Sequence, residues 1–148
     1  MEPEEIYQHA IVLLARKDYS NGEMRRALHH LSDDTMAVEF AIARLRDNNY
    51  LDDQRIADNM VSRFLRKQYG PVRIKLELRQ KGIEQDVADA ALNDCNADWF
   101  QMASDCRCKK FGNDRPADPK EKLRQMRFLQ SRGFTIDMIN EAMAKQEG

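Results

Sequence analysis

The stretch of sequence that decides the fold is residues 69–83, which read YGPVRIKLELRQKGI. Gly70 and Pro71 are typical of a helix start, because proline at the first helical position has no amide hydrogen to leave unpaired. Gly82 is typical of a helix end, since glycine readily adopts the left-handed backbone that follows the last turn. The stretch therefore has a start signal and a stop signal about one short helix apart.

Apolar residues within this stretch alternate with charged ones at the two-residue period of a strand. They are Val72, Ile74, Leu76 and Leu78. We nevertheless predict a helix, because a lone strand would leave its backbone groups unpaired and the sequence offers no second strand. The equivalent segment 120–132 also has a helical pattern. Apolar residues then wrap most of the helix, which predicts that it is more deeply buried than its counterparts.

The same pattern occurs three times along the chain. Leu28, Leu78 and Leu129 are 50 and 51 positions apart, and periods of this size indicate stacked helical repeats. Each copy holds three segments with apolar residues at helical spacing. The sequence predicts an all-α fold of three tandem three-helix repeats that form an elongated, curved array, with repeats at residues 1–52, 53–95 and 96–148.

The second helix of each predicted repeat has clear boundaries. Ser20-Asn21-Gly22-Glu23 is a capping box, and Asp118-Pro119 places proline at the first helical position, as Gly70-Pro71 does. Gly82 and Gly133 are expected to end the second and third of these helices, whereas the first copy has Ser32 at the matching position.

Composition limits the class of protein. The 148 residues are 42% hydrophobic and 33% charged, enough for one extended core. The longest apolar run, residues 10–15, is far shorter than the roughly 20 residues that span a bilayer. The acidic start, Met1 to Glu5, lacks the positive charge of a secretory signal, and the three cysteines suit reduced thiols. We expect a cytoplasmic protein without membrane contact.

Charge is unevenly distributed although the formal net charge is only −1. Residues 33–58 contain seven acids and three bases, whereas residues 107–132 contain nine bases and three acids. The molecule as a whole has no strong attraction for nucleic acid, but its third repeat has a basic character of its own.

None of the reactive side chains forms a recognisable catalytic motif. Asp52-Asp53 could bind a metal ion, but acids just before an apolar helix more often cap it. His29-His30 cannot both face one site from a helix, and we expect them to be exposed. Cys95, Cys106 and Cys108 lack zinc-ligand spacing. Since neither a cluster of carboxylates or histidines nor a glycine-rich phosphate loop is visible in the sequence, we expect no enzyme activity, metal or cofactor.

Three motifs in order resemble the RecX family of recombination regulators. Residues 50–57, YLDDQRIA, resemble its tyrosine-leucine-aspartate-aspartate signature, residues 69–83 its central motif, and residues 127–134, RFLQSRGF, its closing motif. The resemblance covers roughly residues 10–144. Asn49 stands where a glycine commonly precedes the signature, and asparagine tolerates the left-handed backbone. Ile56 replaces a usual phenylalanine, which affects local packing alone.

The resemblance implies that the protein binds the RecA recombinase filament in its helical groove, and we expect it to do so as a monomer. It also implies restraint of filament assembly, ATP hydrolysis, strand exchange and cleavage of the SOS repressor, with single-stranded or duplex DNA in or beside the filament as a further contact. The alternative is direct DNA binding by helix-turn-helix-like modules. Against it, base-reading side chains are not repeated between the copies.

Basic residues of the second and third repeats are the candidate partner-binding residues, because cations on successive helices suit an acidic protein groove or phosphates. The competing interpretation is a solvated face balanced by neighbouring acids such as Asp86 and Asp89. The candidates are Arg66, Lys67, Arg73, Lys75, Arg79, Lys81, Lys109, Lys110, Lys120, Lys122, Arg124, Arg127 and Arg132.

Overall fold

The computed structural model describes residues 1–144 and contains, over that range, nine α-helices and no strand. The prediction of an all-α fold is therefore confirmed. The helices are α1 (Pro3–Leu14), α2 (Asn21–His29), α3 (Thr35–Asp47), α4 (Asp53–Arg66), α5 (Pro71–Lys81), α6 (Gln85–Asp94), α7 (Trp99–Phe111), α8 (Pro119–Ser131) and α9 (Ile136–Ala144).

The chain forms two compact units. Unit 1 consists of Met1–Asn59 and Leu78–Ala90, and unit 2 consists of Met60–Glu77 and Ala91–Gly148. Helices α4, α5 and α6 have residues in both units. The predicted repeat boundaries, after residues 52 and 95, stay a prediction, and the last four residues of the third repeat lie outside the described chain.

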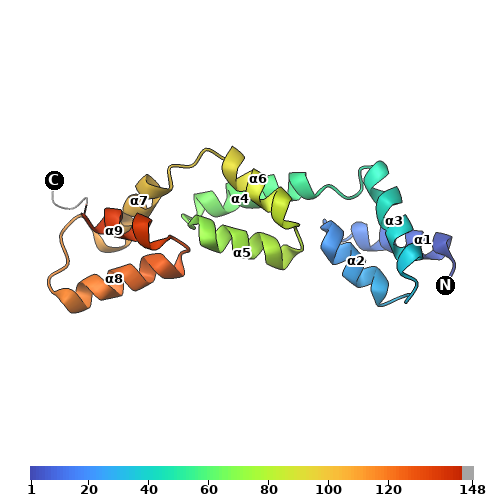
Figure 1. Ribbon diagram of the computed structural model, residues 1–148, viewed down its shortest axis with the longest axis horizontal. Helices are drawn as coiled ribbons and strands as arrows, with labels where there is room; N and C mark the ends of the chain where they lie inside the picture. Colours follow the sequence, from blue (N-terminus) through green and yellow to red (C-terminus); the bar gives the residue numbers. More distant parts are fainter. Residues whose placement is uncertain (145–148) are drawn as a thin grey trace. The chain divides into compact units, whose positions relative to one another are not determined.

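The core of unit 1 lies between α1, α2 and α3, which pack against one another near the N-terminus in Figure 1. Ile6, Met24, Leu28 and Leu45 are fully buried there. They come from the apolar positions that recur at three- and four-residue spacing, so the helical periodicity identified the core side of each helix.

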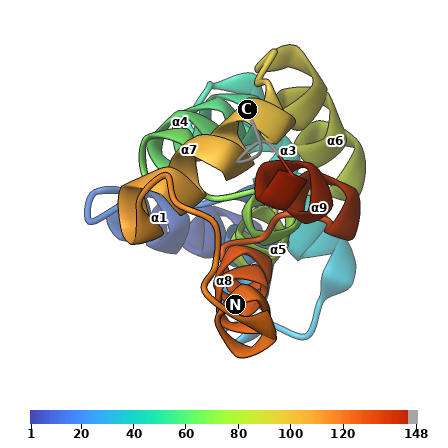
Figure 2. The same ribbon diagram turned by 90° about the vertical axis from the view of Figure 1, so that its left-hand side faces the viewer.

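The third repeat has a core of the same design in unit 2. Figure 2 shows α8 beside α7 and α9, and the three helices contact one another. Ala103, Leu129 and Ala142 are fully buried between them. Leu129 and Leu28, which stand at matching sequence positions, are each fully buried in the core of their own unit.

The predicted start and stop signals are confirmed. Ser20 accepts a hydrogen bond from the Glu23 amide, and the Glu23 side chain accepts one from the Ser20 amide, so the capping box is complete. Helices α5 and α8 begin at Pro71 and Pro119. Just past their ends, Gly82 and Gly133 have φ angles of 92° and 100°.

The helix over 71–81 is confirmed, but its expected deeper burial is wrong. Ile74 and Leu78 are fully buried, whereas Val72 and Leu76 are 57% and 38% exposed. At 100° per residue, Val72 and Leu76 lie on one side of the helix and the buried pair on the other. Alternation in the sequence therefore gives α5 one buried side and an exposed side that is partly apolar.

In unit 1, the start of α2 packs directly on the end of α5, a contact that we call junction 1. The Ser20 hydroxyl donates to the Lys81 carbonyl over 2.5 Å, and the Lys81 ammonium pairs with Glu23 at 2.9 Å. A Cβ on Gly22 would lie 2.6 Å from the Gly82 carbonyl oxygen. The two backbones can approach this closely because both positions are glycine.

In unit 2, the start of α5 packs on the end of α8 in the same manner, which we call junction 2. The Gly70 amide donates to the Arg132 carbonyl over 2.7 Å, and the Val72 amide donates to the Gly133 carbonyl over 3.0 Å. These contacts pair amides at one helix start with carbonyls at another helix end, groups that no intrahelical bond can satisfy. A Cβ on Gly70 would lie 2.4 Å from the Gly133 carbonyl oxygen.

Replacing Gly133 by alanine is expected to weaken junction 2. The new Cβ would lie 2.2 Å from the Cβ of Arg73, and the φ of 100° adds backbone strain. Gly112, with φ of 86° and open space around it, is the matched control for strain alone. Gly112→Ala should cost about 1 kcal/mol of unfolding free energy and Gly133→Ala about 1–3 kcal/mol more, measured by urea denaturation. Equal losses would contradict the close packing.

The two aspartates before α4 have different roles. Asp52 caps α4, since its carboxylate accepts a hydrogen bond from the Arg55 amide over 3.1 Å. Asp53 instead turns to α2 and accepts one from the Asn21 amide over 2.8 Å. Capping was predicted for this pair, but only Asp52 caps its own helix. Burial raises the pKa of the Asp53 carboxyl, and the Asn21 amide partly opposes this.

This raised pKa predicts a pH dependence of stability. Above the ordinary value of 3.8, folded Asp53 holds its proton more firmly than unfolded Asp53, so its contribution to stability falls as pH rises through this window. Asp53→Asn keeps an acceptor for Asn21 but cannot ionise. Its unfolding free energy relative to wild type should therefore rise between about pH 3 and about pH 6 in urea titrations.

The exposed Asp58→Asn is the control for the loss of one negative charge near the same helix. Parallel pH profiles for the two variants would show that burial of Asp53 has no effect on stability.

Candidate functional site

Unit 2 contains a continuous series of aromatic rings with cations placed against them, which we call the cation–aromatic ladder. It runs from the end of α4 through the start of α5 to the end of α7 and the length of α8. Its rings are Phe64, Tyr69, Phe111 and Phe128, and its cations are Arg63, Lys67, Arg73, Lys110, Arg124 and Arg132.

Tyr69 is the ring at which three segments of unit 2 meet. The Arg73 and Arg132 guanidinium groups each lie 4.7 Å from its ring centroid. The ring also stacks on Phe64 at 5.3 Å with an interplanar angle of 16°. Such contacts are each worth about 0.5–1 kcal/mol at partly exposed sites. Tyr69 therefore fixes two positive charges from helices that are distant in the sequence.

The ladder continues along α8 on the side that faces α7. Phe128 meets Phe111 edge to face at 5.3 Å, and the Lys110 ammonium lies 5.6 Å from the Phe128 ring. Arg124 lies 5.0 Å from the Phe111 ring and also binds Glu121 through two hydrogen bonds of 2.8 Å. These bonds lower the pKa of Glu121 to about 2. Arg124 is thus partly neutralised by its own helix.

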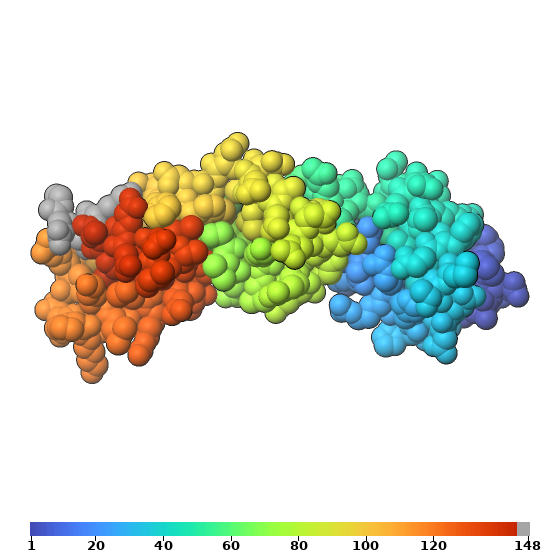
Figure 3. All heavy atoms as spheres, in the orientation of Figure 1, coloured from blue at the N-terminus to red at the C-terminus, as the bar shows by residue number. Residues whose placement is uncertain are grey.

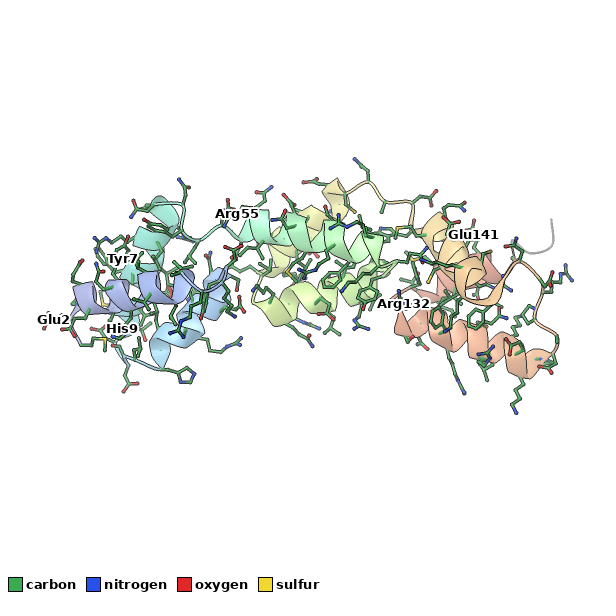
Figure 4. The ribbon with its side chains drawn as sticks, turned by 180° about the vertical axis from the view of Figure 1, so that it is seen from behind. Glu2, Tyr7, His9, Arg55, Arg132 and Glu141 are labelled. Atoms are coloured by element: carbon green, nitrogen blue, oxygen red, sulfur yellow. The ribbon has the colours of Figure 1, made fainter. Side chains whose placement is uncertain are left out.

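Arg132, labelled at the end of α8 in Figure 4, joins the ladder to junction 2. Its guanidinium donates to the Lys67 carbonyl and lies 5.8 Å from the Phe128 ring as well as beside Tyr69. Its backbone carbonyl accepts the Gly70 amide at the junction. The nearby Cys106 thiol is buried, which raises its pKa, although the Arg132 charge opposes the effect. Arg132 is therefore a structural residue as much as a surface cation.

The structure sorts the candidate partner-binding residues by exposure. Arg73, Lys81 and Arg132 are half-buried and hold the junctions, and Lys81 belongs to unit 1, outside the ladder. Lys67, Lys110 and Arg124 are exposed members of the ladder. The other candidates are exposed but lie outside the ladder as defined, and they are Arg66, Lys75, Arg79, Lys109, Lys120, Lys122 and Arg127.

Sequence reasoning missed two informative arginines. Arg63 lies 5.0 Å from the Phe64 ring and one turn before Lys67, and this four-residue spacing could have identified it. Arg107, counted with the basic segment, is fully buried and bonds the Gln125 side chain and the Asp114 carbonyl at 2.7 and 2.8 Å. No pattern in the sequence separates this internal arginine from its exposed neighbours.

The remaining candidates for chemistry lie apart from the ladder. His29 and His30 are exposed, as predicted, and the three cysteines are free thiols. Within residues 1–144, histidine, cysteine and acidic side chains do not gather in groups of three that could hold a metal ion. No helix in this range has the length and apolar character needed to cross a membrane.

Destroying the Tyr69 ring is expected to loosen the ladder. Tyr69→Leu keeps an apolar side chain but removes the stack and two cation–π contacts, so it should lower the unfolding free energy by about 1–3 kcal/mol. Tyr69→Phe keeps the ring and should stay within about 0.5 kcal/mol of wild type by urea denaturation. If both substitutions cost the same, the ring contacts would not contribute to stability.

An all-helical fold that holds a basic surface in place against aromatic rings, over the described residues, defines a class of all-α proteins built from three-helix units. Comparison with known proteins identifies the family. Residues 52–92 match the family model described as RecX, second three-helix domain, and residues 97–143 match RecX, third three-helix domain.

Curated relatives carry the name "Regulatory protein RecX". The chain is 38% identical to the one from Halorhodospira halophila over 95% of this chain and 88% of the relative. It is 38% identical to the one from Acinetobacter baylyi over 93% and 86% of the two chains. The chain therefore belongs to the RecX family.

Two solved structures have the same fold at 20% sequence identity. The crystal structure of RecX from Lactobacillus salivarius matches with a TM-score of 0.81 over 98% of this chain and 96% of that one. A crystal structure titled regulatory protein RecX matches with a TM-score of 0.75 over 97% and 71%.

Proposed function

We propose that this protein binds the RecA recombinase filament and regulates it, mainly by inhibiting filament assembly, ATP hydrolysis, strand exchange and coprotease activity. Membership of a family of regulatory proteins supports this role. The single structural observation that carries the proposal is the cation–aromatic ladder, a basic surface that the fold holds in place.

The ladder suits recognition because its charges are positioned before a partner arrives. A free lysine or arginine loses about 0.5–1.5 kcal/mol of side-chain entropy when it is immobilised in an interface. Contacts with rings hold Lys67 and Lys110 near the surface, so part of this cost is met during folding. Guanidinium groups that lie on a ring still present N–H donors at their edge, which suits carboxylates and phosphates.

Helix α8 adds charge beside the ladder. Besides Arg124, which belongs to the ladder and binds Glu121, the single acid of the helix, α8 has three exposed bases. We infer that the partner surface is acidic. The candidates Lys75 and Arg79 on α5 and Lys120, Lys122 and Arg127 on α8 stay proposed contacts, whereas the half-buried Arg73, Lys81 and Arg132 act by holding the junctions.

The proposed regulation is tested by charge reversal within the ladder. Lys67→Glu with Lys110→Glu removes two exposed ladder cations and should weaken inhibition of RecA ATPase and filament assembly by about tenfold or more. The assay uses substoichiometric doses on single-stranded DNA, with circular dichroism to verify helical content. Arg26→Glu with Arg46→Glu makes the same charge change at exposed positions of unit 1 and should inhibit as wild type does.

Unchanged inhibition by the ladder variant would remove the ladder from the contact surface, and absence of inhibition by wild type would refute the proposed function. Direct DNA binding is the alternative outcome. In that case the protein alone would bind single-stranded DNA with a salt slope near −0.7 per phosphate contact, and the ladder variant would lose this binding without any need for RecA.

A further inference from the structure

Unit 2 has an apolar groove between α8 and α9 that the ladder does not use. It has a volume of about 250 Å³, and its lining is Leu123, Met126, Gln130, Phe134, Ile136 and Ile139, together with the exposed Arg127. Leu123 and Ile136 are 47% and 60% exposed. Its lining residues include no acid, and α8 supplies further bases on both sides of Leu123. The groove is thus a mainly apolar surface with bases along its α8 side, although the exposed acid Asp137 follows Ile136 on α9.

Unit 1 has an exposed apolar face on α3, and the residues at the ends of this face are acidic. Met36 and Phe40, one turn apart, are 84% and 65% exposed. The exposed acids Asp33 and Asp47 lie just before the helix and at its last residue, although Arg46 is exposed beside Asp47. Figure 3 shows α3 in cyan at the surface of unit 1 and the α8–α9 region in orange to red at the surface of unit 2.

Some charged side chains of α3 are already paired within unit 1, which leaves the others available at the exposed face. Glu39 is paired with Arg25, with bonds of 2.5 and 3.2 Å. Arg44 bonds Glu4 over 2.8 Å and lies 3.7 Å from the Tyr7 ring, so this cation is already engaged. In the described part of the chain, the Asp33 and Asp47 carboxylates bind no side chain in this way, and the two acids flank the two apolar side chains. The exposed face is therefore apolar at its centre and acidic at its ends.

We propose that the α3 face of one copy docks into the α8–α9 groove of a second copy. Met36 and Phe40 would fill the groove while Asp33 and Asp47 approach Arg127 and the neighbouring bases of α8. The two surfaces differ, so the contact is heterologous and leaves one free face and one free groove, and association can continue head to tail.

Charge favours this arrangement over a symmetric dimer. Pairing two α3 faces would bring acids together, and pairing two grooves would bring bases together, both of which are unfavourable. The segregation noted in the sequence, acidic at residues 33–58 and basic at 107–132, supplies the complementarity. A formal net charge of −1 gives little overall repulsion between copies.

The contact is expected to be weak, because two apolar anchors cover much less than a standard interface of about 1,600 Å². Association should therefore be negligible in dilute solution and should increase where copies are concentrated side by side on one partner. This inference does not depend on the proposed function, since it concerns the protein alone.

Sedimentation velocity of the full chain from about 10 µM to about 1 mM tests the inference. The weight-average sedimentation coefficient of wild type should rise with concentration. Phe40→Ser removes the face and Arg127→Glu reverses the rim of the groove, and each variant alone should lose this rise. Val12→Ser changes another exposed apolar residue, 58% exposed, and should associate as wild type does.

An equimolar mixture of Phe40→Ser and Arg127→Glu distinguishes head-to-tail from symmetric association. The first variant retains its groove and the second retains its face, so together they should form a one-to-one dimer and nothing larger. A flat wild-type profile, self-association of either single variant, or a mixture that stays monomeric or grows beyond the dimer would each overturn the inference. Circular dichroism verifies that the variants keep their helices.

Discussion

The structure depends on two places where the backbones of two helices approach each other closely. At one the start of α2 meets the end of α5, and at the other the start of α5 meets the end of α8. At junction 1, Gly22 meets Gly82, and at junction 2, Gly70 meets Gly133. A helix end carries carbonyl groups without intrahelical partners, and a helix start carries amides in the same condition. At junction 2 two amides at the start of α5 bond carbonyls at the end of α8, and at junction 1 the Ser20 hydroxyl bonds the Lys81 carbonyl. Neither approach leaves room for a Cβ at the facing glycines. The glycine positions follow from this geometry.

Junction 2 also determines where the ladder forms. The bond from the Gly70 amide to the Arg132 carbonyl brings the end of α8 to the start of α5, where Tyr69 lies. Arg132 and Arg73 then approach the same ring from different helices. A basic surface assembled in this way keeps its charges at fixed positions, which a set of freely rotating lysines would not. The residues that pack the helices of unit 2 together are therefore also residues of its basic surface.

Local signals made much of the fold predictable. Capping at Ser20, proline at residues 71 and 119, and glycine at 82 and 133 act within one turn of a helix, so the sequence indicates them directly. Asn49 has the left-handed φ of 63° expected for the residue before the signature. The role of Asp53 was not predictable, because its partner Asn21 lies 32 residues away. Only part of the ladder was predictable from the sequence. Its basic residues were identified as candidates, but the contact of Arg132 with Tyr69 joins residues about 60 positions apart.

The double role of Arg132 has a consequence for genetics. Its side chain belongs to the basic surface and also donates to the Lys67 carbonyl, and the neighbouring Gly133 has no room for a side chain. A random screen for inactive variants would collect these two positions first, because they fail through folding. Their frequency in such a screen would therefore describe how the helices are joined rather than which residues contact a partner.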